Sequence, residues 1–164
     1  MNEKDCRSIA PCDIRIDKDG IWYFRGSEMF RREIVNFFYQ NLAKDALGRY
    51  MIVLENDQCY LEVEDVPFIV HSAEMEIDGT NGQTILLKLC DETVEKLEFP
   101  TLRIGGQNVL YCSVRNCKFE ARFSRAAYYQ IAQYIEYEPL RDEYFISLNG
   151  HHHVLASGGG LKRC

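Results

Sequence analysis

The sequence lacks the features that place a chain in a membrane or a secretory class. Its apolar runs, such as 85–87, are only a few residues long, whereas a membrane-spanning helix needs about 20. The first five residues are polar and contain no apolar stretch of the kind found in a signal peptide. The sequence therefore predicts no membrane association and a cytoplasmic location.

A positive excess of charge is also missing. The chain has 19 Lys and Arg residues against 25 Asp and Glu residues, a formal net charge of −6. Nucleic acids and anionic membranes attract surfaces of the opposite sign. This balance predicts that neither is a partner, although it allows a local basic pocket. The sequence indicates no oligomeric state.

The seven cysteines form no CxxC pair, and the two that lie nearest to each other are Cys112 and Cys117. A zinc site or a redox motif normally needs closer, paired spacing. In a cytoplasmic protein, we expect cysteines to be reduced thiols packed on strands. The sequence therefore predicts seven free cysteines.

Motifs of catalysis, metal binding and phosphate binding are absent as well. Gly105-Gly106 has neither the GxGxxG nor the GxxxxGK[ST] context, and no nucleophile elbow occurs. The turn at 78–82 lacks the acidic residue that closes a calcium loop. His151 and His153 share one face of a strand, but two exposed imidazoles are a weak metal site. We assign no catalytic residue, no metal and no cofactor.

Alternating strands and two helices are the elements that the sequence does contain. An Asp19-Gly20 turn separates strands near 14–16 and 21–24. Ser27 precedes a helix whose apolar face runs from Phe30 to Leu42 and which ends at 45–48. Later, Ser124 precedes a second helix, expected to reach Tyr137. This pattern predicts an α+β fold with antiparallel sheets.

The two helical regions match each other. Phe30-Arg31-Arg32-Glu33 corresponds to Phe123-Ser124-Arg125-Ala126, and residues 50–56 correspond to 144–150. We interpret this as two similar strand–strand–helix–strand–strand units joined by additional strands. The alternative is two unrelated units that share similar turn and helix-capping residues. The predicted domains are 13–76 and 77–157, with a flexible lead at 1–12 and a flexible tail at 158–164.

These residues also carry a resemblance to a known family. The matching segments are Asp19-Gly20-Ile21-Trp22, Gly48-Arg49-Tyr50, residues 60–68 with the sequence Tyr-Leu-Glu-Val-Glu-Asp-Val-Pro-Phe, residues 119–125, and Ser147-Leu148-Asn149-Gly150. The chain resembles the bacterial family described as domain of unknown function 1285. Residues 79–99 match weakly, and Val53-Leu54 stands where the family has Thr-Pro. The resemblance implies a two-domain α+β fold with structural repetition, and a nucleotide-like ligand in an interdomain cleft with a signalling role. It supplies no catalytic residues.

Arg32 and Arg125 are the first candidate binding residues. An arginine at a helix N-terminus, together with unpaired backbone N–H groups, is well suited to a phosphate or a carboxylate. Ion pairs are the structural alternative: Glu28 with Arg32, and Glu120 or Asp65 with Arg125. The sequence leaves both interpretations open.

Glu64, Asp65, Trp22 and Tyr129 complete the candidate set. Neighbouring carboxylates on a strand point to opposite faces, so Glu64 and Asp65 form an acid–base pair only if Pro67 bends the chain. One of them would bind a ribose-like hydroxyl, or else anchor an arginine. The rings of Trp22 and Tyr129 would stack on a ligand ring.

We therefore expect a non-catalytic ligand-binding or sensing protein for a small anionic, nucleotide-like molecule. Two alternatives remain at this point. One is a hydrolase-type enzyme with Glu64 or Asp65 as general base. The other is a protein–protein interaction module that uses exposed strand edges.

Overall fold

The computed structural model describes residues 9–157, and for 156 and 157 it describes the backbone only. Contacts between Cα atoms divide the chain into two compact units, Met1–Asp65 (unit 1) and Val66–Cys164 (unit 2). The predicted domain boundary after residue 76 and the lead and tail remain predictions, and the predicted tail lies outside the described residues. Each unit is described by itself.

The described part of unit 1 contains six strands and one helix. These are β1 (Ala10–Ile16), β2 (Trp22–Phe24), β3 (Ser27–Glu28), α1 (Arg32–Gln40), β4 (Leu42–Lys44), β5 (Tyr50–Leu54) and β6 (Asp57–Val63). They form one sheet in the order β3-β2-β1-β6-β5-β4. Only β1 and β6 pair in parallel, and the other neighbours are antiparallel.

The first hairpin of unit 1 forms for the reason its sequence suggests. Gly20 adopts a positive φ of 80°, which favours glycine. The Asp17 carboxylate accepts hydrogen bonds from the backbone N–H groups of Asp19 and Ile21, both at 2.9 Å. The turn therefore satisfies its own backbone donors.

Alternation along the strands places one face of each in the core of unit 1. The buried apolar side chains are Ile14, Ile16, Trp22, Tyr39, Leu42, Met51, Ile52 and Leu61. The ring of Trp22 lies 4.8 Å from Tyr39 and 6.0 Å from Phe38, measured between ring centroids. The predicted burial of Trp22 is confirmed, at 2% exposure.

Up to residue 157, unit 2 contains ten strands, one α-helix and two short 3-10 helices. The strands before the helix are β7 (Phe68–Ile77), β8 (Gln83–Leu89), β9 (Val94–Lys96), β10 (Arg103–Ile104), β11 (Leu110–Val114) and β12 (Phe119–Phe123). The 3-10 helices are η1 (Phe99–Thr101) and η2 (Gly106–Asn108). After α2 (Arg125–Ala132) follow β13 (Ile135–Glu138), β14 (Glu143–Leu148), β15 (His151–Val154) and β16 (Ala156–Ser157).

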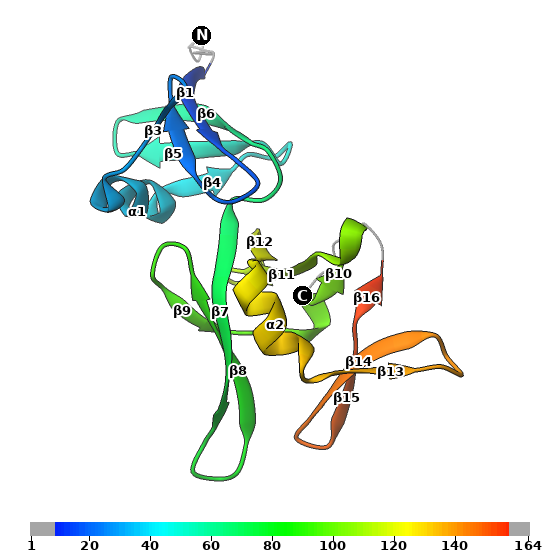
Figure 1. The fold of residues 1–164 in the computed structure, drawn as a ribbon. Coiled ribbons are helices and arrows are strands. Elements are labelled where there is room, and N and C mark those ends of the chain that lie inside the picture. The colour runs from blue at the N-terminus through cyan, green and yellow to red at the C-terminus, as the bar shows by residue number, and fades with distance from the viewer. Residues whose placement is uncertain (1–8, 158–164) are drawn as a thin grey trace, which may run out of the picture. The chain divides into compact units, whose positions relative to one another are not determined.

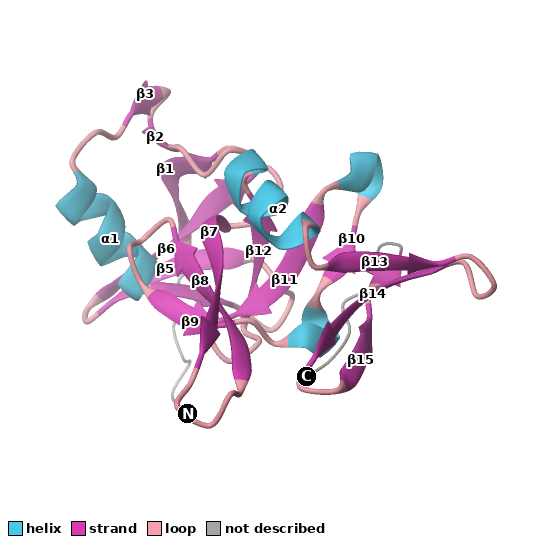
Figure 2. Cartoon of the chain, turned by 60° about the horizontal axis from the view of Figure 1, so that its bottom comes forward, coloured by secondary structure: helices cyan, strands magenta, loops and turns pink. Residues whose placement is uncertain are grey.

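The strands of unit 2 form a seven-stranded sheet, β16-β10-β11-β12-β7-β8-β9, and a three-stranded sheet, β13-β14-β15. Figures 1 and 2 both show α2 beside β7 and β12 of the larger sheet. Strands β15 and β16 are separated only by Leu155, whose N–H donates to the Tyr144 carbonyl at 2.8 Å. The two sheets therefore meet at one continuous extended segment.

If β15 and β16 are taken as one strand, unit 2 repeats unit 1. Strands β10, β11 and β12, helix α2 and strands β13, β14 and β15–β16 then follow the order β12-β11-β10-β16/β15-β14-β13. This order corresponds strand by strand to β3-β2-β1-β6-β5-β4. The predicted α+β fold with two similar units is confirmed, but each repeat has three strands before and three after its helix instead of two. The prediction of antiparallel sheets was too simple, because β1 pairs with β6, and β10 with β16, in parallel. Strands β7, β8 and β9 are the additional linking strands.

The predicted ends of both helices were wrong. Leu42 lies on β4 and not on α1, and Ile135–Tyr137 lie on β13 and not on α2. In both units the apolar face continues into a strand that pairs with the next one, Leu42 opposite Ile52 and Ile135 opposite Ile146. Tertiary pairing thus decided the conformation of residues whose spacing alone fits a helix.

Candidate functional site

A cavity of about 380 Å³ lies at the N-terminus of α2, within unit 2. Its charged and aromatic lining consists of Arg122, Arg125, Tyr128 and Tyr129. The remaining lining residues are Gln107, Asn108, Val109, Leu110, Phe123 and Ser124. We call this the Arg125 cavity. It contains two of the predicted site residues, Arg125 and Tyr129.

The turn from β12 into α2 positions the two arginines. Ser124 has extended backbone angles, and its Oγ accepts a hydrogen bond from the Ala127 N–H at 3.2 Å. The same hydroxyl donates to the His71 carbonyl at 3.3 Å, which ties the start of α2 to β7. Ser124 is therefore the N-cap that the sequence predicts. Arg125 is the first helical residue, next to the positive end of the helix dipole.

Arg125 has no hydrogen bond or ion pair with another side chain within residues 9–157. Glu120, one of its predicted partners, instead pairs with Arg103, whose Nη2 lies 2.8 Å from the Glu120 Oε1. Both of those side chains are largely buried, at 14% and 16% exposure. Arg125 thus lines the cavity without a side-chain partner among the described residues, and the lining contains no carboxylate that would compete with an anion.

The two tyrosines add an aromatic wall. Tyr128 and Tyr129 lie side by side, with ring centroids 5.7 Å apart and an edge-to-face angle of 77°. Tyr129 is 67% exposed, so its ring is accessible from solvent. The predicted stacking role of Tyr129 remains a prediction.

Another part of the lining comes from η2, where Gln107 and Asn108 adopt positive φ angles of 57° and 59°. This conformation is uncommon for residues other than glycine and costs energy. A hydrogen bond from the Gly105 N–H to the Val109 carbonyl, at 2.7 Å, closes the loop. Sequence reasoning missed Asn108, Arg122 and Tyr128, because they reach the cavity from separate elements. The Gln-Asn pair after Gly105-Gly106 was the only local signal.

Arg32 and Trp22 belong to unit 1. Arg32 is the first residue of α1, as Arg125 is of α2, and its N-cap Arg31 makes no side-chain capping bond. The two arginines therefore hold equivalent places in the repeat. Trp22 packs inside unit 1 against Phe38 and Tyr39, so the described residues already surround its ring.

Glu64 and Asp65 lie in the segment that ends unit 1. Glu64 accepts hydrogen bonds from the Arg15 Nη1 at 3.5 Å and from the Lys18 N–H at 3.2 Å. It thus fastens the first hairpin to the end of β6, which is the arginine-anchoring role that the sequence leaves open. No catalytic group converges on it within the described part of the chain.

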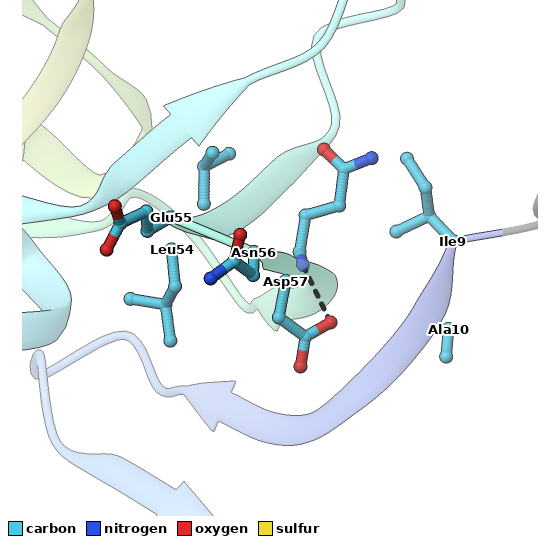
Figure 3. A pocket seen from close by; sticks show the side chains of 8 residues that line it. Ile9, Ala10, Leu54, Glu55, Asn56 and Asp57 are labelled. Carbon is cyan, nitrogen blue, oxygen red and sulfur yellow. Dashed lines mark hydrogen bonds between the residues drawn. The ribbon is translucent and has the colours of Figure 1, made fainter.

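Another cavity, of about 500 Å³, lies in unit 1 at the β5–β6 turn and the start of β1. Figure 3 shows the carboxylates of Glu55 and Asp57 on its wall, with the Gln58 N–H bonded to Asp57. This lining is acidic and contains no arginine. It does not suit an anion.

The histidines of β15 pack against aromatic rings. His152 stacks on Phe145 and His153 on Phe99, with centroid distances of 3.8 and 4.5 Å. Burial, and then the neighbouring imidazoles of His151 and His152, lower the pKa of His153. Residues 9–157 contain no group of three or more potential metal ligands. Nor does any helix among them have the length and apolarity to cross a membrane.

The prediction of seven free cysteines was wrong. Cys12 on β1 and Cys59 on β6 form a disulfide, with Cα atoms 5.0 Å apart. Cys117 is disulfide-bonded as well, whereas Cys112 is a free, buried thiol. The prediction relied on close sequence spacing and on the reducing compartment. The disulfide instead joins residues 47 positions apart that become neighbours because β1 and β6 pair.

The fold and the site define a duplicated α+β protein with an arginine- and tyrosine-lined cavity in its second repeat. Two solved structures resemble it, both described as DUF1285 family proteins. One is from Silicibacter pomeroyi, with a TM-score of 0.74 and 20% identity over 90% of this chain and 81% of that one. The other is from Shewanella baltica, with a TM-score of 0.62 and 16% identity over 77% of this chain and 94% of that one.

Residues 4–66 match the family model described as the N-terminal domain of DUF1285, a domain of unknown function. No curated protein matches the chain. The N-terminal part of the chain thus matches this family, and the fold resembles those of two of its members. The resemblance first noted in its sequence motifs is thereby confirmed.

Proposed function

We propose that this protein is a non-catalytic ligand-binding or sensing protein, and that the Arg125 cavity accepts a small anionic, nucleotide-like molecule. The observation that carries the proposal is that Arg125 has no side-chain partner in the described part of the chain and lines a cavity together with Arg122, Tyr128 and Tyr129. A signalling role would follow if ligand binding changed the state of the protein. The expected cleft between the units, and the action of Arg32 and Arg125 on one ligand, remain predictions.

The chemistry of the cavity suits a phosphate or carboxylate group. A guanidinium donates two parallel hydrogen bonds to such an anion, and the first N–H groups of a helix donate more. Hydrogen bonds to charged groups contribute about 1.5–3 kcal/mol each. The tyrosine rings offer stacking surfaces for a base or another ring. General acid–base catalysis would require a poised carboxylate or imidazole, and none lines this cavity.

A thermal-shift experiment tests the proposal with adenosine 5′-monophosphate, adenosine and inorganic phosphate as probes. A probe at 100 times its Kd stabilises the native state by about 2.7 kcal/mol, which is readily measured as a rise in Tm. We expect adenosine 5′-monophosphate to raise the Tm more than adenosine does. Arg125→Ala should abolish the difference.

Arg141→Ala is the matched control, because Arg141 is an exposed arginine of the same unit outside the cavity. It should respond to the probes as the unaltered protein does. If Arg125→Ala and Arg141→Ala show the same response, the Arg125 cavity is not the anion site.

A further inference from the structure

The two repeats correspond residue by residue in their first hairpins. Arg15 pairs with Tyr23 and Ile16 with Trp22 in unit 1. Arg103 pairs with Tyr111 and Ile104 with Leu110 in unit 2. The guanidinium also stacks on the tyrosine in both, 4.6 Å from the ring centroid in unit 1 and 4.4 Å in unit 2. Trp22 and Leu110 therefore hold the same position of the repeat.

This position differs between the units in size and in what surrounds it. In unit 1 the indole of Trp22 fills the space between the sheet and α1 and contacts Phe38 and Tyr39. In unit 2 the smaller Leu110 lies at the base of a cavity of about 540 Å³. Its other lining residues are Ile104, Gly105, Gly106, Asn108, Tyr128, Ile135 and Tyr144. We call it the Leu110 cavity.

Gly105 and Gly106 contribute no side chain to the lining of the Leu110 cavity. A Cβ atom on Gly105 would lie 2.6 Å from the Cε2 of Tyr111, which is closer than real contacts permit. In unit 1 the equivalent residue is Asp17, whose carboxylate bonds the backbone of its own turn. Unit 2 thus lacks both the ring and the turn side chain that unit 1 has at these places.

The two cavities of unit 2 adjoin each other. Asn108, Leu110 and Tyr128 line both of them. One side of this shared wall carries Arg122 and Arg125, and the other carries mainly apolar and aromatic side chains. A compact ligand could therefore place its charged end in the Arg125 cavity and its apolar end in the Leu110 cavity, on either side of the shared residues.

We propose that the Leu110 cavity binds a planar aromatic ring, and that the ring belongs to a compact ligand whose anionic group occupies the Arg125 cavity. The indole of Trp22, at the equivalent position, shows the shape of group that this fold accepts between sheet and helix. Tyr128 and Tyr144 would pack against the ring, and Asn108 offers one polar group for its edge. For the anionic end, this inference rests on the proposed function.

Methyl NMR spectroscopy tests the ring site directly, because Ile104 and Ile135 both line it. The probes are indole, phenyl phosphate and inorganic phosphate. We expect indole and phenyl phosphate to shift the δ1-methyl signals of Ile104 and Ile135 through their ring currents. The signal of Ile52, in the core of unit 1, should not move.

Filling the cavity supplies the matched variants. Leu110→Trp, which copies unit 1, should weaken indole binding by at least about tenfold, since the added ring occupies the site. Ile135→Trp fills the same cavity from a partly exposed strand and should act alike if Leu110→Trp does not fold. Val94→Trp adds a tryptophan at an exposed position of β9 and should leave indole binding unchanged.

The outcomes separate the ring site from the proposed anion site. If indole binds to the unaltered protein and Leu110→Trp or Ile135→Trp removes this binding, the ring site is supported. This conclusion does not depend on how Arg125→Ala changes phenyl phosphate binding. If phenyl phosphate binds no more tightly than inorganic phosphate and indole leaves both methyl signals in place, the ring site is overturned while the anion site stands. If indole binds but Arg125→Ala does not weaken phenyl phosphate, the proposed function fails and the ring site remains.

Discussion

The two units of this protein have the same strand order but differ in how their cores are filled. Unit 1 has the indole of Trp22 under α1, and its first and last strands are joined by the Cys12–Cys59 disulfide. Unit 2 has Leu110 at the same position, a cavity beside it and three additional strands, β7, β8 and β9. One backbone thus supports a tightly filled core in one copy and a lined cavity in the other. The difference lies in a few side chains.

Breaking the disulfide should give the largest effect, confined to unit 1. The disulfide closes a loop of 47 residues, and the loss of its constraint on the unfolded chain corresponds to about 4 kcal/mol in the chain-entropy model. We expect Cys59→Ser to lower the free energy of unfolding by up to that amount in urea titrations. Cys12→Ser should match it, and the double variant should lose no more. Equal stability of the protein with and without reductant would contradict this prediction.

Exchanging the core residues of the repeat should give the next largest effect. Trp22→Leu removes a large ring from a filled core, and we expect a loss of about 2–3 kcal/mol in the free energy of unfolding. Leu110→Trp places the ring where unit 2 has a cavity and should change stability by less than about 1.5 kcal/mol. Urea unfolding followed by circular dichroism measures both. If the two variants are equally destabilised, the Leu110 cavity does not accept a ring.

The single tryptophan reports on the same core by fluorescence. Because Trp22 is buried, its emission should be blue-shifted in the native protein and should move to longer wavelength as the chain unfolds. Emission at the hydrated wavelength in the native protein would contradict the packing of unit 1.

Replacing the equivalent arginines Arg125 and Arg32 compares the two units in ligand binding, with a moderate expected change in affinity. Arg125→Ala should weaken adenosine 5′-monophosphate by about tenfold, which corresponds to about 1.4 kcal/mol. If both units act on one ligand, Arg32→Ala should weaken it as well, and circular dichroism should show both variants folded. An effect of Arg125→Ala alone would assign binding to unit 2. Unchanged affinity in both would remove the arginines from the site.

The smallest effect that we predict concerns the β4–β5 turn of unit 1. Burial alone would raise the pKa of the Asp45 carboxyl, but hydrogen bonds from the Arg49 backbone and guanidinium, the Tyr60 hydroxyl and the Leu47 N–H lower it to about 2. A lowered pKa in the folded state stabilises the protein above the unfolded value, near 4, and this contribution is lost as the pH falls toward 2. Asp45→Asn should flatten the pH dependence of Tm between these values. An unchanged slope would contradict the prediction.

The sequence predicted the features that depend on neighbours along the chain. Ser124 caps α2, Asp19-Gly20 turns the first hairpin, and the Phe-x-Arg and Tyr50/Tyr144 matches revealed the repeat. Capping, turn formation and strand alternation act over a few residues, so their signals are local. For the same reason Trp22, on an aromatic strand after a tight turn, could be predicted as buried.

Tertiary structure decided the features that depend on pairing between distant segments. The parallel pairing of β1 with β6 brought Cys12 to Cys59. The pairing of β4 with β5 and of β13 with β14 ended the two helices earlier than their apolar spacing suggests. The equivalence of Trp22 and Leu110 became visible only through the register of the two hairpins. Asn108, Leu110 and Tyr128 come from three separate elements, and folding alone places them on one wall. Strand register and the packing of helix on sheet bring such residues together, and no short pattern in the chain encodes either.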